Sequence, residues 1–129
     1  MSTATHRMTA DELFLLPHDG TKRYRLIAGE LRTMSPAGSQ HGFVADNVAH
    51  YLNCFIRPRR LGKIFAAGTG FVVQRNPDTV LASDVSFVLR DHIPAGGPLR
   101  EFFPGPPDPA VEVISPSDCQ DEIDEKVEV

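Results

Sequence analysis

Three residues in the second half of the chain, Asp84, Glu112 and Lys126, are of the types that metal-assisted hydrolysis of a phosphodiester requires. Asp84 lies in the stretch SDVSFVL and Glu112 in PAVEVIS, so both acids have apolar neighbours. Because a buried carboxylate without a partner is costly, acids in such strands are expected to pair with a cation or to bind a metal. Two carboxylates can hold Mg²⁺, which keeps several waters, takes phosphate oxygens as further ligands and lowers the pKa of an attacking water.

Lys126 would supply the cationic group of such a site. From the segment 115–118, Glu112 lies about 10 Å back along a strand, and Lys126 about 12 Å forward along a helix. A helix that folds back along the sheet would therefore bring Lys126 level with Glu112. On a helical wheel Lys126 borders the stripe formed by Ile123 and Val127, and its long stem can reach inward to act on the attacking water or on the transition state.

Each of these three residues also has a simpler explanation. Asp84 could be a strand-end residue near solvent, and Glu112 could pair with an arginine. Lys126 could form a surface ion pair with Glu122. Residue types and spacing alone leave both explanations open.

The first elements that must position these groups are a short helix and a hairpin. Residues 9–12, TADE, form a capping box, which predicts a helix that stops before Pro17. Residues 24–34, YRLIAGELRTM, predict a hairpin around the central Ala-Gly pair, with Leu26 and Leu31 in the core.

A longer helix should follow the hairpin. Its predicted buried face consists of apolar residues at helical spacing: Val44, Val48, Leu52 and Phe55. We expect this helix to end at 57–58, because a residue before proline is disfavoured in helical conformation.

The second half of the chain predicts strands followed by a last helix. The strands are expected at 63–67, 71–75, 84–90 and 110–115, with a long ordered loop rich in proline and glycine at 91–109. Cap residues at 115–118 begin the final helix. The sequence therefore predicts a mixed α/β fold, a single domain over 1–129 with helices packed on one curved sheet.

Composition excludes several classes of protein. The 129 residues are 41% hydrophobic and 23% charged, which is typical of one globular domain. No apolar run is long enough to cross a membrane, and residues 1–10 do not resemble a signal peptide, so we expect a cytoplasmic protein. Cys54 and Cys119 have no metal-site spacing, and no phosphate-binding glycine motif is present.

Charge is distributed unevenly along the chain. Residues 1–70 carry nine Lys or Arg and five acids, whereas residues 71–129 carry four and twelve. A basic region could neutralise phosphates while clustered acids hold a cation, although a solvated acidic helix face would give the same pattern. The best candidates for contacts to a nucleic-acid backbone are Arg57, Arg59, Arg60 and Lys63, unless they form a plain exposed turn.

Two further sets of residues on the second predicted helix have alternative interpretations. His41 could touch a phosphate or make a hydrogen bond at the start of the helix. Asp46 and His50 are four residues apart and could share a metal, but a solvated helix face explains them better.

Several separated blocks of sequence resemble a known family. YRLIAGELRTMSP, HGFVADNVAHYL, GTGFVV, SDVSFV, AVEVISPSD and EKV occur in the order seen in the bacterial "putative restriction endonuclease" domain family, which has the PD-(D/E)XK nuclease fold. The resemblance implies a metal site of Asp84, Glu112 and the backbone carbonyl of Val113. It also implies Lys126 as the catalytic lysine, displaced to the helix after the strand, and Glu30 as an accessory acid.

The chain departs from the family pattern at three places. Ser83 stands where a proline usually precedes the aspartate, and Ala28 stands where an acid is common. The chain also ends at Val129, within the helix that carries Lys126, where the family continues into another apolar strand. We therefore expect a truncated member with an unpaired sheet edge.

The resemblance and the residues together predict a Mg²⁺-dependent endonuclease that cleaves DNA and leaves 5′-phosphate and 3′-hydroxyl ends. The alternative is a catalytically inactive module with the nuclease fold that binds nucleic acid or a partner protein. A third interpretation is a structural subunit, for example of a homodimer, in which a second chain supplies the missing strand.

Overall fold

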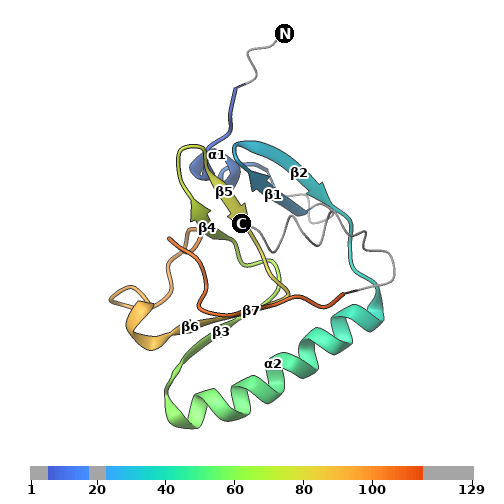
Figure 1. The fold of residues 1–129 in the computed structure, drawn as a ribbon, viewed down its shortest axis with the longest axis vertical. Coiled ribbons are helices and arrows are strands. Elements are labelled where there is room, and N and C mark those ends of the chain that lie inside the picture. The colour runs from blue at the N-terminus through green and yellow to red at the C-terminus, as the bar shows by residue number, and fades with distance from the viewer. Residues whose placement is uncertain (1–5, 18–22, 115–129) are drawn as a thin grey trace.

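The computed structural model describes residues 6–17 and 23–114, and within them it forms two antiparallel sheets with one long helix (Figure 1). In chain order the elements are α1 (Ala10–Phe14), β1 (Arg23–Ile27), β2 (Glu30–Met34), α2 (Ser39–Arg59), β3 (Gly62–Phe65), β4 (Phe71–Gln74), β5 (Thr79–Leu81), β6 (Val85–Leu89), the 3₁₀ helix η1 (Arg90–His92) and β7 (Ala110–Val111). No helix in the described ranges is long and apolar enough to span a bilayer. The mixed α/β class is confirmed, but two sheets stand where one was predicted.

The first sheet has the strand order β2-β1-β5-β4 and contains the predicted hairpin. Ala28 and Gly29 have φ values of 47° and 83°, the two positive angles that a tight hairpin turn between twisted strands requires. Leu26 is fully buried, as predicted, because β1 lies between β2 and β5. Leu31 was wrongly assigned to the core: it pairs with Leu26, but on the edge strand β2, and it is 39% exposed.

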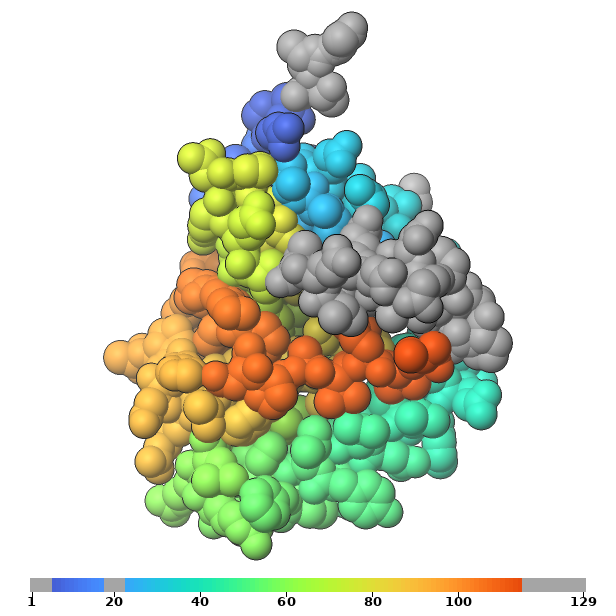
Figure 2. Space-filling model, viewed as in Figure 1, coloured from blue at the N-terminus to red at the C-terminus, as the bar shows by residue number. Residues whose placement is uncertain are grey.

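The second sheet has the order β3-β6-β7, and α2 packs against β3 and β6. Its core contains Phe71, Val88 and Phe103. Phe103 comes from the long loop and forms a bridge with Phe71 of β4, which connects the two sheets. Figure 2 shows the described residues after about 100 as an orange band that crosses the molecule between α2 and the β4–β5 hairpin.

Helix α2 differs from its prediction in its buried face and in its end. Ile56 is buried, whereas Val44 and Phe55 of the predicted core stripe are exposed. The helix continues through Pro58 and ends where Arg60 adopts a left-handed conformation, with φ of 53°. Pro58 costs the backbone hydrogen bond of its missing N–H, and the helix ends one residue after it, so few later turns depend on the local distortion.

Three other elements differ from their predictions. Strand β5 was missed, since three residues carry too little alternation to be recognised. Strand β7 has two residues instead of six, and η1 begins the segment that was predicted as loop. The predicted final helix lies outside the described residues.

Asp78 connects α1 to the turn between β4 and β5. One carboxylate oxygen accepts a hydrogen bond from the N–H of Ala10 (2.8 Å) and the other accepts one from the N–H of Asn76 (3.1 Å). These backbone hydrogen bonds, the one from Ala10 first, lower the pKa of Asp78, and Arg75 adds a smaller electrostatic contribution. The charged carboxylate therefore stabilises the junction of α1 with the first sheet.

Replacing Asp78 with asparagine should lower the free energy of unfolding at pH 7 by about 1–2 kcal/mol, because the amide oxygen can accept only one of the two hydrogen bonds, now without the negative charge, while the amide nitrogen faces the other N–H. The folded-state pKa lies below the ordinary value, so this stabilisation is complete above the ordinary pKa and is lost as the pH falls through the folded pKa. Urea unfolding of the parent and of D78N between pH 7 and pH 2.5 measures the difference in unfolding free energy at each pH. A difference that stays constant over this range would contradict the assignment.

Candidate active site

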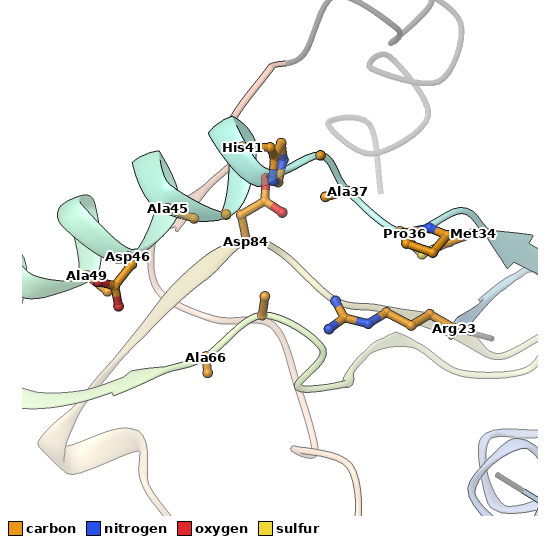
Figure 3. Close-up of a pocket in the computed structure, with 13 residues that line it drawn as sticks. Arg23, Met34, Pro36, Ala37, His41, Ala45, Asp46, Ala49, Ala66 and Asp84 are labelled. Atoms are coloured by element: carbon orange, nitrogen blue, oxygen red, sulfur yellow. Dashed lines mark ion pairs between the residues drawn. The ribbon is translucent and has the colours of Figure 1, made fainter. Parts of the chain in front are cut away.

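Asp84 lies between β5 and β6, where three distant parts of the chain meet. Its Oδ2 accepts a hydrogen bond from the N–H of Val113 (2.7 Å) and lies 3.1 Å from Nε2 of His41 in the first turn of α2. The Asp84 and His41 side chains are each 16% exposed, and Figure 3 shows them pointing toward one another. His41 therefore contacts a candidate metal ligand directly, a contact that was not predicted from the sequence.

The pairing of β6 with β7 places Glu112 next to Asp84. Val85 pairs with Val111 in an antiparallel register, and continuing this register by one residue sets Asp84 opposite Glu112. Residues directly opposite in antiparallel strands project to the same face, with Cβ atoms about 5 Å apart. The structure thus brings Asp84 and Val113 into contact, and the extrapolated register would place Glu112 on the same face as Asp84.

The end of the proline-rich loop is held on β6 before β7 begins. Asp108 accepts a hydrogen bond from the N–H of Leu89 (2.7 Å) and pairs with Nδ1 of His92 (2.8 Å). Phe87 exchanges two backbone hydrogen bonds with this segment, through the N–H of Asp108 and the carbonyl of Pro109. These bonds help to fix the register in which β7 pairs with β6.

Asp84 and His41 open onto a cavity of about 520 Å³ between the open end of the β1–β2 hairpin and α2 (Figure 3). Arg23 and Met34, which pair at that end of the hairpin, also line it. A neighbouring hollow of about 260 Å³ shares Arg23 and Asp84. Arg23 is a cation at the site that sequence reasoning missed, because only the position of the hairpin brings it there.

The donors at this junction fit a magnesium ion better than a zinc ion. In the described part of the chain no three His, Cys, Asp or Glu side chains group closely enough to enclose a metal. Two carboxylates and the Val113 carbonyl would supply oxygens alone. Mg²⁺ suits such a partial set, because it keeps several waters and needs one or two carboxylates, whereas structural zinc takes four protein ligands rich in Cys and His.

Glu30 is not brought to this cavity. It begins β2 beside the hairpin turn, and its 72% exposed side chain lies 3.6 Å from Arg32. Asp84 is near the opposite end of the hairpin, where Arg23 pairs with Met34.

The remaining predicted site residues have separate locations. Lys126 lies outside the described residues. Asp46 lines the cavity, but His50 on the same helix contacts Cys54 (3.6 Å). The basic cluster lies at the far end of α2, where Arg57, Arg60 and Lys63 line another cavity. Arg59 instead stacks on Phe55, with its guanidinium 4.0 Å from the ring centre.

Comparison with known proteins agrees with this architecture. The fold matches the crystal structure of a "putative nuclease belonging to DUF820" from Anabaena variabilis ATCC 29413, with a TM-score of 0.73 and 23% identity over 90% of this chain. This chain spans 63% of the length of that protein. No curated protein sequence matches. Residues 10–129 match the Uma2 family, described as "Putative restriction endonuclease", and the chain belongs to that family.

Proposed function

We propose that this protein is an endonuclease that hydrolyses DNA phosphodiester bonds with a Mg²⁺ ion held by Asp84, Glu112 and the carbonyl of Val113. The observation that supports it most is the junction of β6 and β7, where the Asp84 carboxylate accepts a hydrogen bond from the N–H of Val113 (2.7 Å) and lines a cavity. Glu112, next to Val113, would face Asp84 if the register of β6 and β7 continued by one residue. Membership of the Uma2 family, described as "Putative restriction endonuclease", supports the class of reaction.

Hydrolysis at this site would proceed by in-line attack of water on phosphorus. The water oxygen forms a bond to phosphorus, the bond to the 3′-oxygen breaks, and the proton released by the water is taken up by solvent while the 3′-oxygen gains one. The products are a 5′-phosphate and a 3′-hydroxyl. A bound Mg²⁺ ion would lower the pKa of the attacking water and would stabilise negative charge on the phosphate.

Three side chains would support the reaction. His41, at 3.1 Å, positions the Asp84 carboxylate, and Arg23 at the cavity wall can neutralise a substrate phosphate. Lys126 is proposed to orient the water or to stabilise charge in the transition state.

A plasmid-nicking assay tests the proposed function. With Mg²⁺ the protein should convert supercoiled DNA to the nicked form, EDTA should stop the reaction, and added Mg²⁺ should restore it. Parallel RNA and single-stranded substrates measure the preference for DNA. Binding that weakens with salt while the plasmid stays intact, with Mg²⁺ or Mn²⁺, would instead identify a module that binds without cutting.

A further inference from the structure

A second cavity, of about 430 Å³, lies at the C-terminal end of α2 and carries a concentration of positive charge. Its polar and charged lining consists of Asn53, Arg57, Arg60, Lys63 and Arg90, and no described acid lines it. Arg90 was not part of the basic cluster predicted from the sequence. Arg90 lies at this cavity because its backbone N–H donates a hydrogen bond to the carbonyl of Leu61 (2.9 Å), a residue that closely follows α2 in the chain.

Helix capping does not account for this arrangement. Cations near a helix C-terminus are favoured by the helix dipole, which would explain Arg57 and Arg60. Lys63 and Arg90 belong to β3 and η1, however, and converge on the same hollow. The acid next to Arg90, Asp91, lies 3.8 Å away in a highly exposed pair and offsets little of its charge.

The guanidinium of Arg57 is also held in place. Its Nε donates to Oδ1 of Asn53 (3.2 Å), one turn earlier on α2 and also at the cavity. Arg59, two residues later, does not line the cavity. One of its terminal guanidinium nitrogens instead donates a hydrogen bond to the carbonyl of Phe55 (2.8 Å). Of the predicted basic cluster, Arg57, Arg60 and Lys63 therefore line the candidate anion site, and Arg59 does not.

The basic cavity and the Asp84 cavity lie along one seam between α2 and β3. The residues of α2 that line them form one stripe at helical spacing, with Gly42, Asp46 and Ala49 at the Asp84 cavity and Asn53 and Arg57 at the basic cavity. Arg60, the residue after the helix, continues this stripe. Strand β3 runs back beside α2, with Lys63 at the basic cavity and Ala66, just after the strand, at the Asp84 cavity (Figure 1). Asp46, the acid of this stripe, is at the Asp84 end, where a bound divalent cation would reduce its repulsion of phosphate.

We propose that the basic cavity binds a backbone phosphate of the same DNA that is cleaved at Asp84, about seven base pairs from the cut. His41 and Arg57 are sixteen residues apart on α2, about 24 Å along the helix axis. With the duplex axis taken parallel to α2, a rise of about 3.4 Å per base pair converts this distance to about seven base pairs. The inference rests on the proposed function, and it makes the preferred substrate a duplex that extends at least this far from the cleaved bond.

A binding experiment without cleavage tests the cavity. A labelled 20-base-pair duplex is titrated in EDTA, at several salt concentrations, with four proteins. These are D84N and the double variants that combine D84N with R57A, R90A or R59A. R57A and R90A should each weaken binding several-fold and reduce the slope of log K against log salt by about 1. R59A removes the same charge from the same end of α2, outside the cavity, and should have a clearly smaller effect.

Duplex length then tests the spacing. Affinity of D84N should rise steeply between about 6 and 10 base pairs, and the R57A/R90A double substitution should remove this rise. An equal effect of R59A, a rise that survives the double substitution, or absence of DNA binding would each overturn the inference. Failure of the parent to nick DNA, with the binding pattern intact, would count against hydrolysis alone.

Discussion

Asp84→Asn should reduce Mg²⁺-dependent nicking by about 100- to 1000-fold, the loss typical of removing one preorganised electrostatic contact at a reacting centre. Asparagine has nearly the same shape as aspartate and keeps one side-chain oxygen. That oxygen can accept the hydrogen bond that the Val113 N–H donates to Oδ2 of Asp84 in the parent (2.7 Å). The substitution removes the negative charge that would hold the metal ion. The fall should therefore appear as lost activity, while the folded structure remains.

Initial rates on supercoiled plasmid at saturating Mg²⁺, with thermal unfolding in parallel, measure this effect. Glu112→Gln should give a loss of similar size, because both carboxylates would hold the same ion. Asp91→Asn is the matched control, since Asp91 is 90% exposed on η1, away from the Asp84 cavity. If D84N and E112Q cut as fast as the parent, the metal site is assigned to the wrong residues.

Phe71→Ala should lower the free energy of unfolding by about 3–5 kcal/mol, the range for removal of a large buried aromatic side chain. Phe71 is 1% exposed, and its ring centre lies 5.3 Å from that of Phe103 and 5.8 Å from that of Phe65. These contacts join β4, β3 and the long loop. Since small domains are stable by about 5–15 kcal/mol in total, one such substitution removes a large share.

Phe43→Ala is the matched control for this prediction. Phe43 lies on the outer face of α2 and is 68% exposed, so its truncation should change stability by less than about 0.5 kcal/mol. Chemical unfolding of the three proteins gives the comparison. Equal losses for F71A and F43A would show that the buried aromatic cluster does not hold the two sheets together.

Elements with local causes were predictable from the sequence. The capping box that begins α1 is formed by Thr9 and Glu12, three residues apart, and it is present as predicted. The hairpin turn depends on two adjacent residues with positive φ, Ala28 and Gly29. The capping box depends on hydrogen bonds within four residues, and the glycine of the turn tolerates positive φ. The turn is also held by contacts from distant segments: the N–H of Ala28 donates to Oγ1 of Thr79 and the N–H of Gly29 donates to the carbonyl of Asp78.

The face that α2 buries could not be predicted in the same way. Val44 and Phe55 of the predicted stripe are exposed, Val48 and Leu52 are half-buried, and Ile56, four residues after Leu52, is buried, so the buried face is shifted around the helix from the predicted one. A helix with apolar residues on more than one side offers several stripes at helical spacing. The choice among them depends on where β3 and β6 lie.

By itself, the sequence determined which acids in apolar surroundings needed a partner, Asp84 and Glu112, and which segments would form the local elements around them. Only the tertiary structure decided which groups share a site. The pairing of β6 with β7 brings Val113 to Asp84, the packing of α2 places His41 against Asp84, and the hairpin places Glu30 at its turn, far from Asp84. The reason is that contacts between residues distant in the chain depend on strand pairing and helix packing, which are set by burial over the whole domain and leave no local pattern in the sequence.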